Sequence, residues 1–143
     1  ATELGVNRII PVYSSYTQRN VSLNSERLTK IAVSACEQCG RSIVPDISPS
    51  IEFSELVSRA SNTYMIFPWE RELNGDLRSA IDETQSDISI FIGPEGGITQ
   101  QEKAQLVAAG AKSVTLGSRI LRAETAAIAA LAAVFYEMGE WKL

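Results

Sequence analysis

The chain has 143 residues, 45% of them hydrophobic, and a formal net charge of −4, which predicts one domain with a core of its own. It contains no histidine and only two cysteines, which excludes histidine-based acid/base catalysis and the common zinc sites, so no metal site is expected. The acidic balance also disfavours a surface that holds nucleic acid by itself, because phosphate contacts need clustered Lys and Arg.

The predicted elements alternate between strands and helices along the whole chain. Apolar, β-branched runs indicate the strands, and apolar residues at helical spacing indicate the helices. Such an alternation predicts an α/β fold with a mostly parallel sheet. In chain order, the strand candidates are residues 6–13, 63–69, 87–92 and 114–116, and the helix candidates are residues 24–39, 53–60, 77–81, 100–109 and 125–138.

The connections in the N-terminal half are polar or extended. Pro11 interrupts the first strand candidate or places it near an edge, because proline cannot donate to a strand ladder. Residues 14–21 are polar and predict a loop. Residues 42–50, which contain two prolines, predict an extended connector.

Cys36 and Cys39 form a C-x-x-C pair at the C-terminal end of the first helix candidate. A redox role is disfavoured, because reactive pairs gain thiolate character at a helix N-terminus, whereas the helix dipole opposes an anion at the C-terminal end. Both positions fall on the apolar face of the helix. Two buried thiols are therefore predicted.

Trp69 ends the second strand candidate, directly after Pro68. It is interpreted either as a rim residue that covers the edge of the sheet or as part of a ligand site, and both interpretations stay open. The charged residues 70–72 that follow predict a surface loop.

The strongest ligand-binding signal is the glycine-rich stretch at residues 93–97, directly after the strand candidate 87–92. Pro94 and the three glycines end the strand, and bare glycine amides can meet a ligand. The stretch is not a phosphate loop, because no Lys and hydroxyl residue follow the last glycine. A tight turn that merely needs glycine is the alternative, although a turn leaves Glu95 unexplained.

Thr99 and Glu102 have the spacing of a capping box, so a helix is predicted to begin directly after this loop. Strand, glycine loop and helix N-terminus then follow one another. Open α/β sheets bind ligands at such places, outside the carboxyl ends of the strands.

A second loop begins at Gly117 and opens the final helix candidate. That helix is rich in alanine, and its apolar surface is wider than one core stripe. It therefore predicts close packing against a second copy of the chain and hence a homodimer. The alternative is a single central helix buried by its own sheet.

The sequence also carries signals about location. Its apolar runs are too short to span a bilayer and its first residues lack the pattern of a signal peptide, so no membrane partner is expected and the cytoplasm is the predicted location. The chain begins at Ala1, and residues 1–5 resemble the last turn of a helix closed by glycine. A segment upstream is therefore expected to have been removed.

With both loops in view, the chain resembles the catalytic domain of the bacterial small-subunit ribosomal RNA uridine-N3 methyltransferase family, a branch of the SPOUT methyltransferases. The two long motifs, in this order and spacing, make the resemblance specific. The residues that carry it are 2–6, Glu37-Gln38 with Arg41, Val44-Pro45, 91–97 and 116–126.

The resemblance implies a SPOUT fold with a C-terminal trefoil knot, which periodicity alone would not suggest because knots are rare. It also implies a homodimer, S-adenosylmethionine as the cofactor, and methylation of N3 of a uridine in 16S ribosomal RNA, the partner being that RNA or the assembled small subunit. The family carries an N-terminal RNA-binding β-barrel domain that this chain lacks. Residues 1–143 are therefore expected to be the catalytic domain, with activity of this part alone in question.

The resemblance further implies that S-adenosylmethionine binds between the two loops, bounded by the end of the second strand candidate. Backbone groups of the loops would bind the adenine edge and the ribose, and apolar side chains would hold the ring. The expected cofactor-binding residues are Phe67, Ile92, Gly93, Pro94, Glu95, Gly97, Leu116, Gly117, Ser118, Ile120, Leu121, Thr125 and Ala126.

Arg122 and Glu95 are expected to be the catalytic residues. The uracil N3 proton is only weakly acidic, so Arg122 would stabilise the anionic uracil oxygens, and Glu95 would accept the proton if its loop raises its pKa. The alternatives are that Arg122 pairs with Glu124 or a phosphate, and that Glu95 only holds its loop through amide hydrogen bonds.

An RNA methyltransferase domain is thus the leading hypothesis. The alternative is an α/β module that binds a nucleoside or cofactor without chemistry, and a thiol oxidoreductase is disfavoured. Cofactor binding separates the first two from the third, and methylation of small-subunit RNA by a longer protein separates the first from the second.

Overall fold

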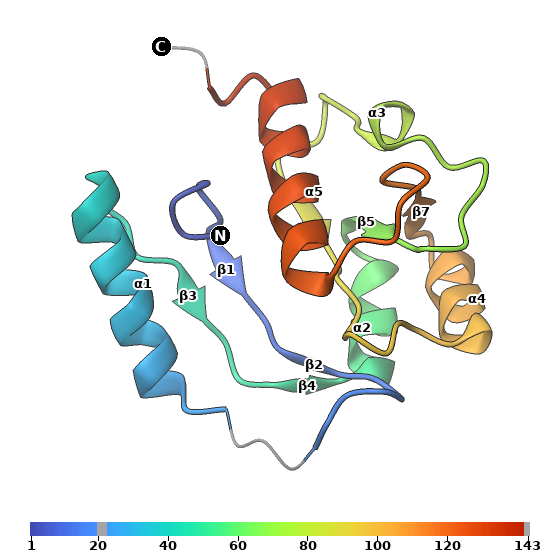
Figure 1. The fold of residues 1–143 in the computed structure, drawn as a ribbon, viewed down its shortest axis with the longest axis horizontal. Coiled ribbons are helices and arrows are strands. Elements are labelled where there is room, and N and C mark those ends of the chain that lie inside the picture. The colour runs from blue at the N-terminus through green and yellow to red at the C-terminus, as the bar shows by residue number, and fades with distance from the viewer. Residues whose placement is uncertain (20–22, 142–143) are drawn as a thin grey trace.

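The computed structural model describes residues 1–19 and 23–141, so the loop predicted at residues 14–21 lies partly outside the described residues. The described chain alternates strands and helices (Figure 1). The strands are β1 (Arg8–Ile9), β2 (Val12–Tyr13), β3 (Asp46–Ile47), β4 (Ile51–Glu52), β5 (Tyr64–Pro68), β6 (Ile88–Ile90) and β7 (Lys112–Val114), and the helices are α1 (Ser25–Cys39), α2 (Phe53–Ala60), α3 (Leu77–Ala80), α4 (Gln100–Ala108) and α5 (Ala123–Glu137).

Every strand pair in the described part of the chain is parallel, which confirms the predicted parallel arrangement. β1 pairs with β3, β2 pairs with β4, and β5 lies between β6 and β7. The strands therefore form three small sheets rather than one continuous sheet. Pro11 separates β1 from β2 and Pro49 separates β3 from β4, because proline has no amide donor for a ladder.

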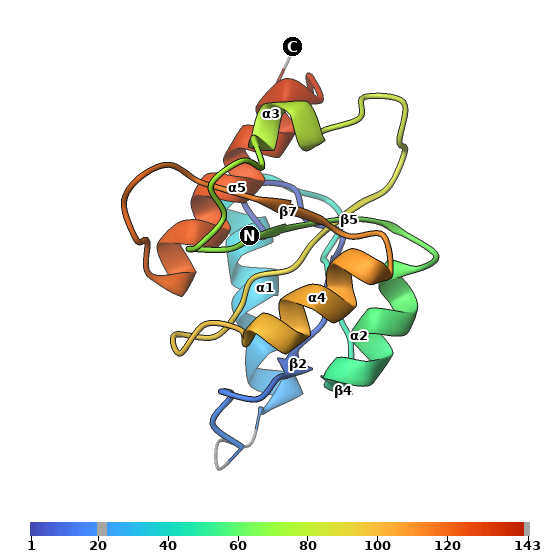
Figure 2. The ribbon, with the colours of Figure 1, turned by 90° about the vertical axis from the view of Figure 1, so that its right-hand side faces the viewer.

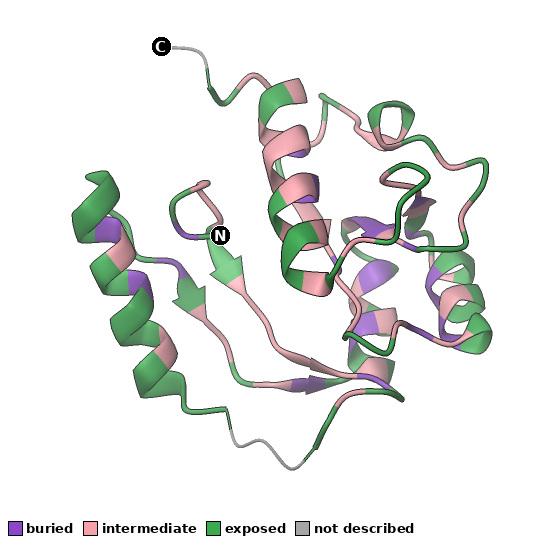
Figure 3. Cartoon of the chain, viewed as in Figure 1, coloured by how far each residue is buried: buried purple, intermediate pink, exposed green. Residues whose placement is uncertain are grey.

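The first helix, α1, begins and ends where the sequence predicts. The Asn24 side chain accepts a hydrogen bond from the Arg27 amide, and Gly40 ends the helix with φ 74°. The prediction of two buried thiols is wrong for one of them: Cys36 is buried, but Cys39 is exposed. The reason is that α1 packs on β3 at one side only and is otherwise mostly exposed (Figure 3).

Two segments that carry the family resemblance are joined by Arg41. Its Nη1 donates hydrogen bonds to the Thr2 carbonyl at 3.0 Å and the Val6 carbonyl at 2.7 Å. Its Nη2 donates to Asn7 Oδ1 at 3.0 Å. The N-terminal turn is thus fastened to Arg41, two residues after the end of α1.

The main core surrounds β5. Met65 and Phe67 pack in one cluster with Leu56 of α2 and Leu106 of α4. Ile66 is also buried but lies outside that cluster, because successive strand side chains point to opposite faces. Accordingly, α2 and α4 cover one face of the β6-β5-β7 sheet and α5 covers the other (Figure 2).

Two predicted elements, the last strand and the last helix, begin two residues earlier in the structure than predicted. β7 begins and ends two residues before the strand predicted at residues 114–116, because Lys112 and Ser113 pair with Ile66 and Phe67 of β5 despite their polar character. α5 begins at residue 123, two residues before its predicted start.

The helices of the described residues are short. The longest, α1 and α5, have 15 residues each. None of the helices in the described ranges has both the length and the apolar character needed to cross a membrane.

Candidate functional site

A cavity of about 660 Å³ opens at the carboxyl ends of β5, β6 and β7. Three segments line it: residues 68–70 after β5, residues 92–98 after β6, and a stretch within residues 115–126 that leads from β7 into α5. Small-molecule sites have volumes of about 300–1,000 Å³, and α/β sheets bind ligands at this edge. The cavity is large enough and suitably placed for a nucleotide-sized ligand.

The structure gathers most of the expected cofactor residues around this cavity. Those that line it are Ile92, Gly93, Pro94, Glu95, Gly97, Leu116, Gly117, Ile120, Leu121 and Ala126, together with Arg122. Phe67, Ser118 and Thr125 are not among its lining residues. Phe67 is fully buried in the core, and the three residues after it form the wall instead.

The first wall is the glycine loop, residues 93–97, and it is firmly held. The Phe91 amide donates to the Ile66 carbonyl at 3.0 Å, and the Gly97 amide donates to the Pro94 carbonyl at 2.8 Å. Gly97 has φ 73°, in the left-handed region that glycine adopts without strain. Ile98 is buried directly behind the loop. Contacts within the protein therefore hold this wall in place.

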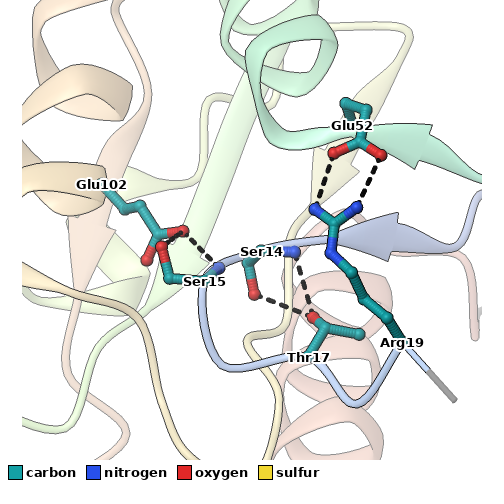
Figure 4. A network of polar contacts seen from close by, with 6 residues as sticks. All are labelled: Ser14, Ser15, Thr17, Arg19, Glu52 and Glu102. Carbon is teal, nitrogen blue, oxygen red and sulfur yellow. Dashed lines mark hydrogen bonds and ion pairs between the residues drawn. The ribbon is translucent and has the colours of Figure 1, made fainter.

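Glu102 fastens the start of α4 behind the glycine loop. The predicted capping box is present: the Glu102 amide donates to Thr99 Oγ1 at 3.1 Å, and the Thr99 amide donates to Glu102 Oε2 at 2.8 Å. The other carboxylate oxygen accepts from the amide and the hydroxyl of Ser15 at 2.8 and 2.9 Å (Figure 4). Burial raises the pKa of Glu102, but hydrogen bonds from Thr99 and Ser15 outweigh burial and hold that pKa below its ordinary value.

The second wall is the loop of residues 117–122, called here the second loop, and it has fewer contacts. The Gly117 amide and the Thr115 hydroxyl lie 3.2 Å apart, and α5 begins directly after Arg122 with no side-chain cap. Ile120 is 83% exposed. The apolar side chain of Ile120 is therefore largely open to solvent.

The cavity carries charges of both signs. Arg119 and Arg122 line it from the second loop, and Glu70 and Glu95 line it from the other segments. Within residues 1–19 and 23–141, no ion pair joins Arg122 to Glu124, and Glu95 accepts no amide hydrogen bond. Both side chains are thus available to a ligand. Over the same residues, no cluster of three or more His, Cys, Asp or Glu side chains suits a metal ion.

Trp69 combines features of its two sequence-based interpretations. It is 8% exposed and belongs to the core cluster, yet it also lines the cavity. Lys103 Nζ lies 4.9 Å from the centroid of its ring. Its buried Nε1 has no hydrogen-bond partner among the described residues. The sequence leaves a ligand-site role for Trp69 open but does not predict one for Glu70, although its position shortly after a buried strand is a signal for this edge.

Comparison with known proteins places this arrangement in a family. A family model described as an RNA methyltransferase domain matches residues 1–135. The chain is 42% identical over 137 residues to ribosomal RNA small subunit methyltransferase E of Rickettsia conorii, covering 94% of this chain and 55% of that protein. It is 33% identical over 148 residues to the Bacillus subtilis protein of the same name, covering 95% of this chain and 58% of that protein.

The fold of this chain also resembles that of a solved structure. The ribosomal RNA small subunit methyltransferase E from Neisseria gonorrhoeae, bound to S-adenosyl methionine, superimposes with a TM-score of 0.85 at 38% identity, over 99% of this chain and 59% of that one. The chain therefore spans a little over half the length of these relatives. The resemblance seen in the motifs is confirmed, and the chain belongs to the RNA methyltransferase domain family.

Proposed function

We propose that this chain is the catalytic domain of an S-adenosylmethionine-dependent enzyme that methylates N3 of a uridine in small-subunit ribosomal RNA. The observation that carries the proposal is the cavity at the carboxyl ends of β5, β6 and β7, where residues from both loop motifs meet. A relative of the same fold is bound to S-adenosyl methionine, and relatives named for small-subunit ribosomal RNA methylation align with more than nine-tenths of the chain at 33–42% identity.

The residues of the cavity fit this cofactor. Ile92, Leu116 and Leu121 offer apolar surface for an adenine ring, and the glycine loop offers backbone close to the ligand. Trp69 Nε1 is a buried donor without a partner in the described residues, at the wall of the same cavity. The bound cofactor would supply a methyl group on a positively charged sulfur.

Two charged residues of the cavity suit the chemistry of the base. The N3 atom of uracil must lose its proton before or while it accepts the methyl group. Glu95 would take that proton, and Arg122 would donate hydrogen bonds to the uracil oxygens as negative charge develops there. The chain contains no histidine, so carboxylate and guanidinium groups are the available choices in this cavity.

The fold would be completed by a trefoil knot. The resemblance to the SPOUT methyltransferases supports this knot, with the glycine loop and the second loop, which line the same cavity, as its loops. The remaining length of the whole protein would hold the RNA-contacting β-barrel domain, and the net charge of −4 supports that division, because a cationic surface is needed for RNA backbone contacts.

We also propose that α5 mediates a homodimer. Its buried residues are Ala130 and Val134, while Ile128 is 58% exposed and Ala129 and Ala132 are half-buried. Replacing Ala129 with Arg should give a folded monomer by light scattering and circular dichroism. A protein that unfolds instead would favour a helix buried by its own sheet.

The proposed function is tested with the full-length protein. It should bind S-adenosylmethionine in calorimetry and place one methyl group on N3 of a uridine in small subunits that lack the mark, as read by mass spectrometry of nucleosides. Cofactor binding without methylation would support a domain that binds the cofactor but does not catalyse methyl transfer. If folded protein gave no heat of binding at millimolar cofactor, both the methyltransferase and the cofactor-binding hypotheses would be wrong.

A further inference from the structure

The described part of the β2–α1 connection, residues 14–19, packs on the outer side of the glycine loop. A Cβ atom built on Gly96 would stand 2.8 Å from Cβ and 3.3 Å from Cγ of Tyr16. The base of the Tyr16 side chain therefore rests on Gly96, where a larger residue would not fit. Ser14 and Thr17 line a second cavity of about 370 Å³, which shares part of the glycine loop with the first.

This segment is fastened on both sides of Tyr16 (Figure 4). On one side, Ser15 donates two hydrogen bonds to the buried Glu102 carboxylate. On the other, Arg19 donates to both oxygens of Glu52 at 3.1 and 2.9 Å and lies 5.3 Å from the centroid of the Tyr13 ring. Residue 16 is therefore held in place next to the glycine loop.

The Tyr16 ring lies beside Gly96 at its Cγ–Cδ2 edge. The residue is 56% exposed, although its Cβ is in contact with a loop that lines the proposed cofactor cavity. A flat aromatic surface is thus presented beside the reaction site by a segment with defined contacts. A single exposed aromatic is common on protein surfaces, but this one is set apart by its contact with a loop of the proposed cofactor cavity.

Single-stranded RNA is recognised largely by stacking of unpaired bases on aromatic side chains. Each such stack is worth about 1–3 kcal/mol and tolerates different bases, because every base has a π-face. In a chain with a net charge of −4, stacking is an interaction with RNA that needs no cationic surface.

We propose that Tyr16 is a substrate-positioning residue that stacks on an unpaired base of the RNA beside the glycine loop. The inference rests on the proposed function and adds the residue that holds the substrate. Tyr16 touches neither the cofactor cavity nor the reacting atoms, so its contribution is to substrate affinity.

The test uses the full-length protein with small subunits lacking the mark. Tyr16→Ala should raise the KM for the subunits about 5- to 150-fold, while kcat and the cofactor Kd stay within about twofold. Tyr16→Trp should restore the KM, and Tyr16→Leu, which keeps apolar bulk without a π-face, should not. Trp141→Ala, which removes an aromatic of similar exposure beyond the end of α5, is the matched control and should behave as wild type.

A readout independent of activity separates this inference from the proposed function. Small-subunit RNA that carries 4-thiouridine should photo-crosslink to Tyr16 even without cofactor. A wild-type KM for Tyr16→Ala, full activity of Tyr16→Leu, or crosslinks that map elsewhere would each overturn the stacking role. Crosslinking at Tyr16 without any methyl transfer would instead retain the stacking role and remove the proposed function.

Discussion

The two walls of the cavity are built differently. The glycine loop is held by backbone hydrogen bonds, by the buried Ile98 and by the Glu102 carboxylate behind it. The second loop carries Ile120 with 83% of its surface exposed, and Arg122 has no side-chain cap contact at the start of α5. One wall is thus anchored to the folded core at Ile98, whereas the other exposes the Ile120 side chain.

Because of this difference, we expect substitutions in the two walls of the cavity to affect different properties of the protein. Substitutions of Phe91 and Ile98, the buried residues that flank the glycine loop, should act mainly on the free energy of unfolding. Substitutions in the second loop should act mainly on binding or rate. Preorganised groups lower the cost of binding, and groups that become ordered on binding raise it.

The largest effect is expected behind the glycine loop. Ile98→Ala should lower the free energy of unfolding by about 2–5 kcal/mol, because a buried aliphatic side chain leaves a cavity when truncated. Urea denaturation at neutral pH measures the change. Ile98→Val is the conservative control and should cost about 0.5–1.5 kcal/mol. A cost below 1 kcal/mol for Ile98→Ala would mean that this wall is not part of the core.

Arg122→Ala should lower the rate of methyl transfer about 10²- to 10³-fold at saturating cofactor, because a donor to developing negative charge is lost. Cofactor affinity and the free energy of unfolding should change little, since the side chain is exposed. Single-turnover assays of the full-length protein measure the rate. Arg119→Ala removes the same charge from the same cavity and should have a smaller effect. Equal losses in both variants would point to net charge rather than to the position of Arg122.

Glu102→Gln should lower the free energy of unfolding at pH 7 by about 1–3 kcal/mol, because a buried ionised acceptor of several hydrogen bonds is replaced. The pKa of Glu102 is lower in the folded than in the unfolded protein, so its stabilisation is present above the ordinary carboxyl pKa of about 4.3 and is lost as the pH falls through the folded-state pKa. The difference between the two proteins should therefore shrink below about pH 4.

Denaturant titrations at several pH values measure this difference. Glu83→Gln replaces an exposed carboxylate and should stay within about 0.5 kcal/mol of wild type at every pH. A gap between wild type and Glu102→Gln that is the same at pH 7 and pH 3 would show that shape, rather than charge, matters at this position.

Local sequence signals predicted the elements that carry this site. The capping box of Thr99 and Glu102 and the glycine stop at Gly40 depend on residues a few positions apart, and both are present. The position of the glycine loop is also predictable from local residues, because Pro94 and its neighbours end a strand regardless of the rest of the fold.

Local sequence signals do not predict contacts between segments that are far apart in the chain. The hydrogen bond between Ser15 and Glu102 joins residues 87 positions apart. Neither local sequence pattern predicts it. Cys39 was expected to be buried from helical spacing alone, but the width of the surface under α1 decides its exposure. The role of Trp69 in the cavity wall depends likewise on where β5 ends relative to its neighbours.

The smallest effect is expected at the tip of the second loop. Ile120→Ala should change the free energy of unfolding by less than about 0.5 kcal/mol, because the side chain is already exposed. Cofactor affinity in calorimetry should nevertheless fall about 5- to 10-fold, since the bound ligand would remove part of this side chain from water and about 0.8 kcal/mol is gained per buried methylene. Leu73→Ala, which truncates a side chain with 87% exposure outside the cavity, should change neither quantity. An unchanged cofactor Kd for Ile120→Ala would mean that the second loop does not cover the ligand, and its apolar side chains would then have to face another partner, such as the RNA.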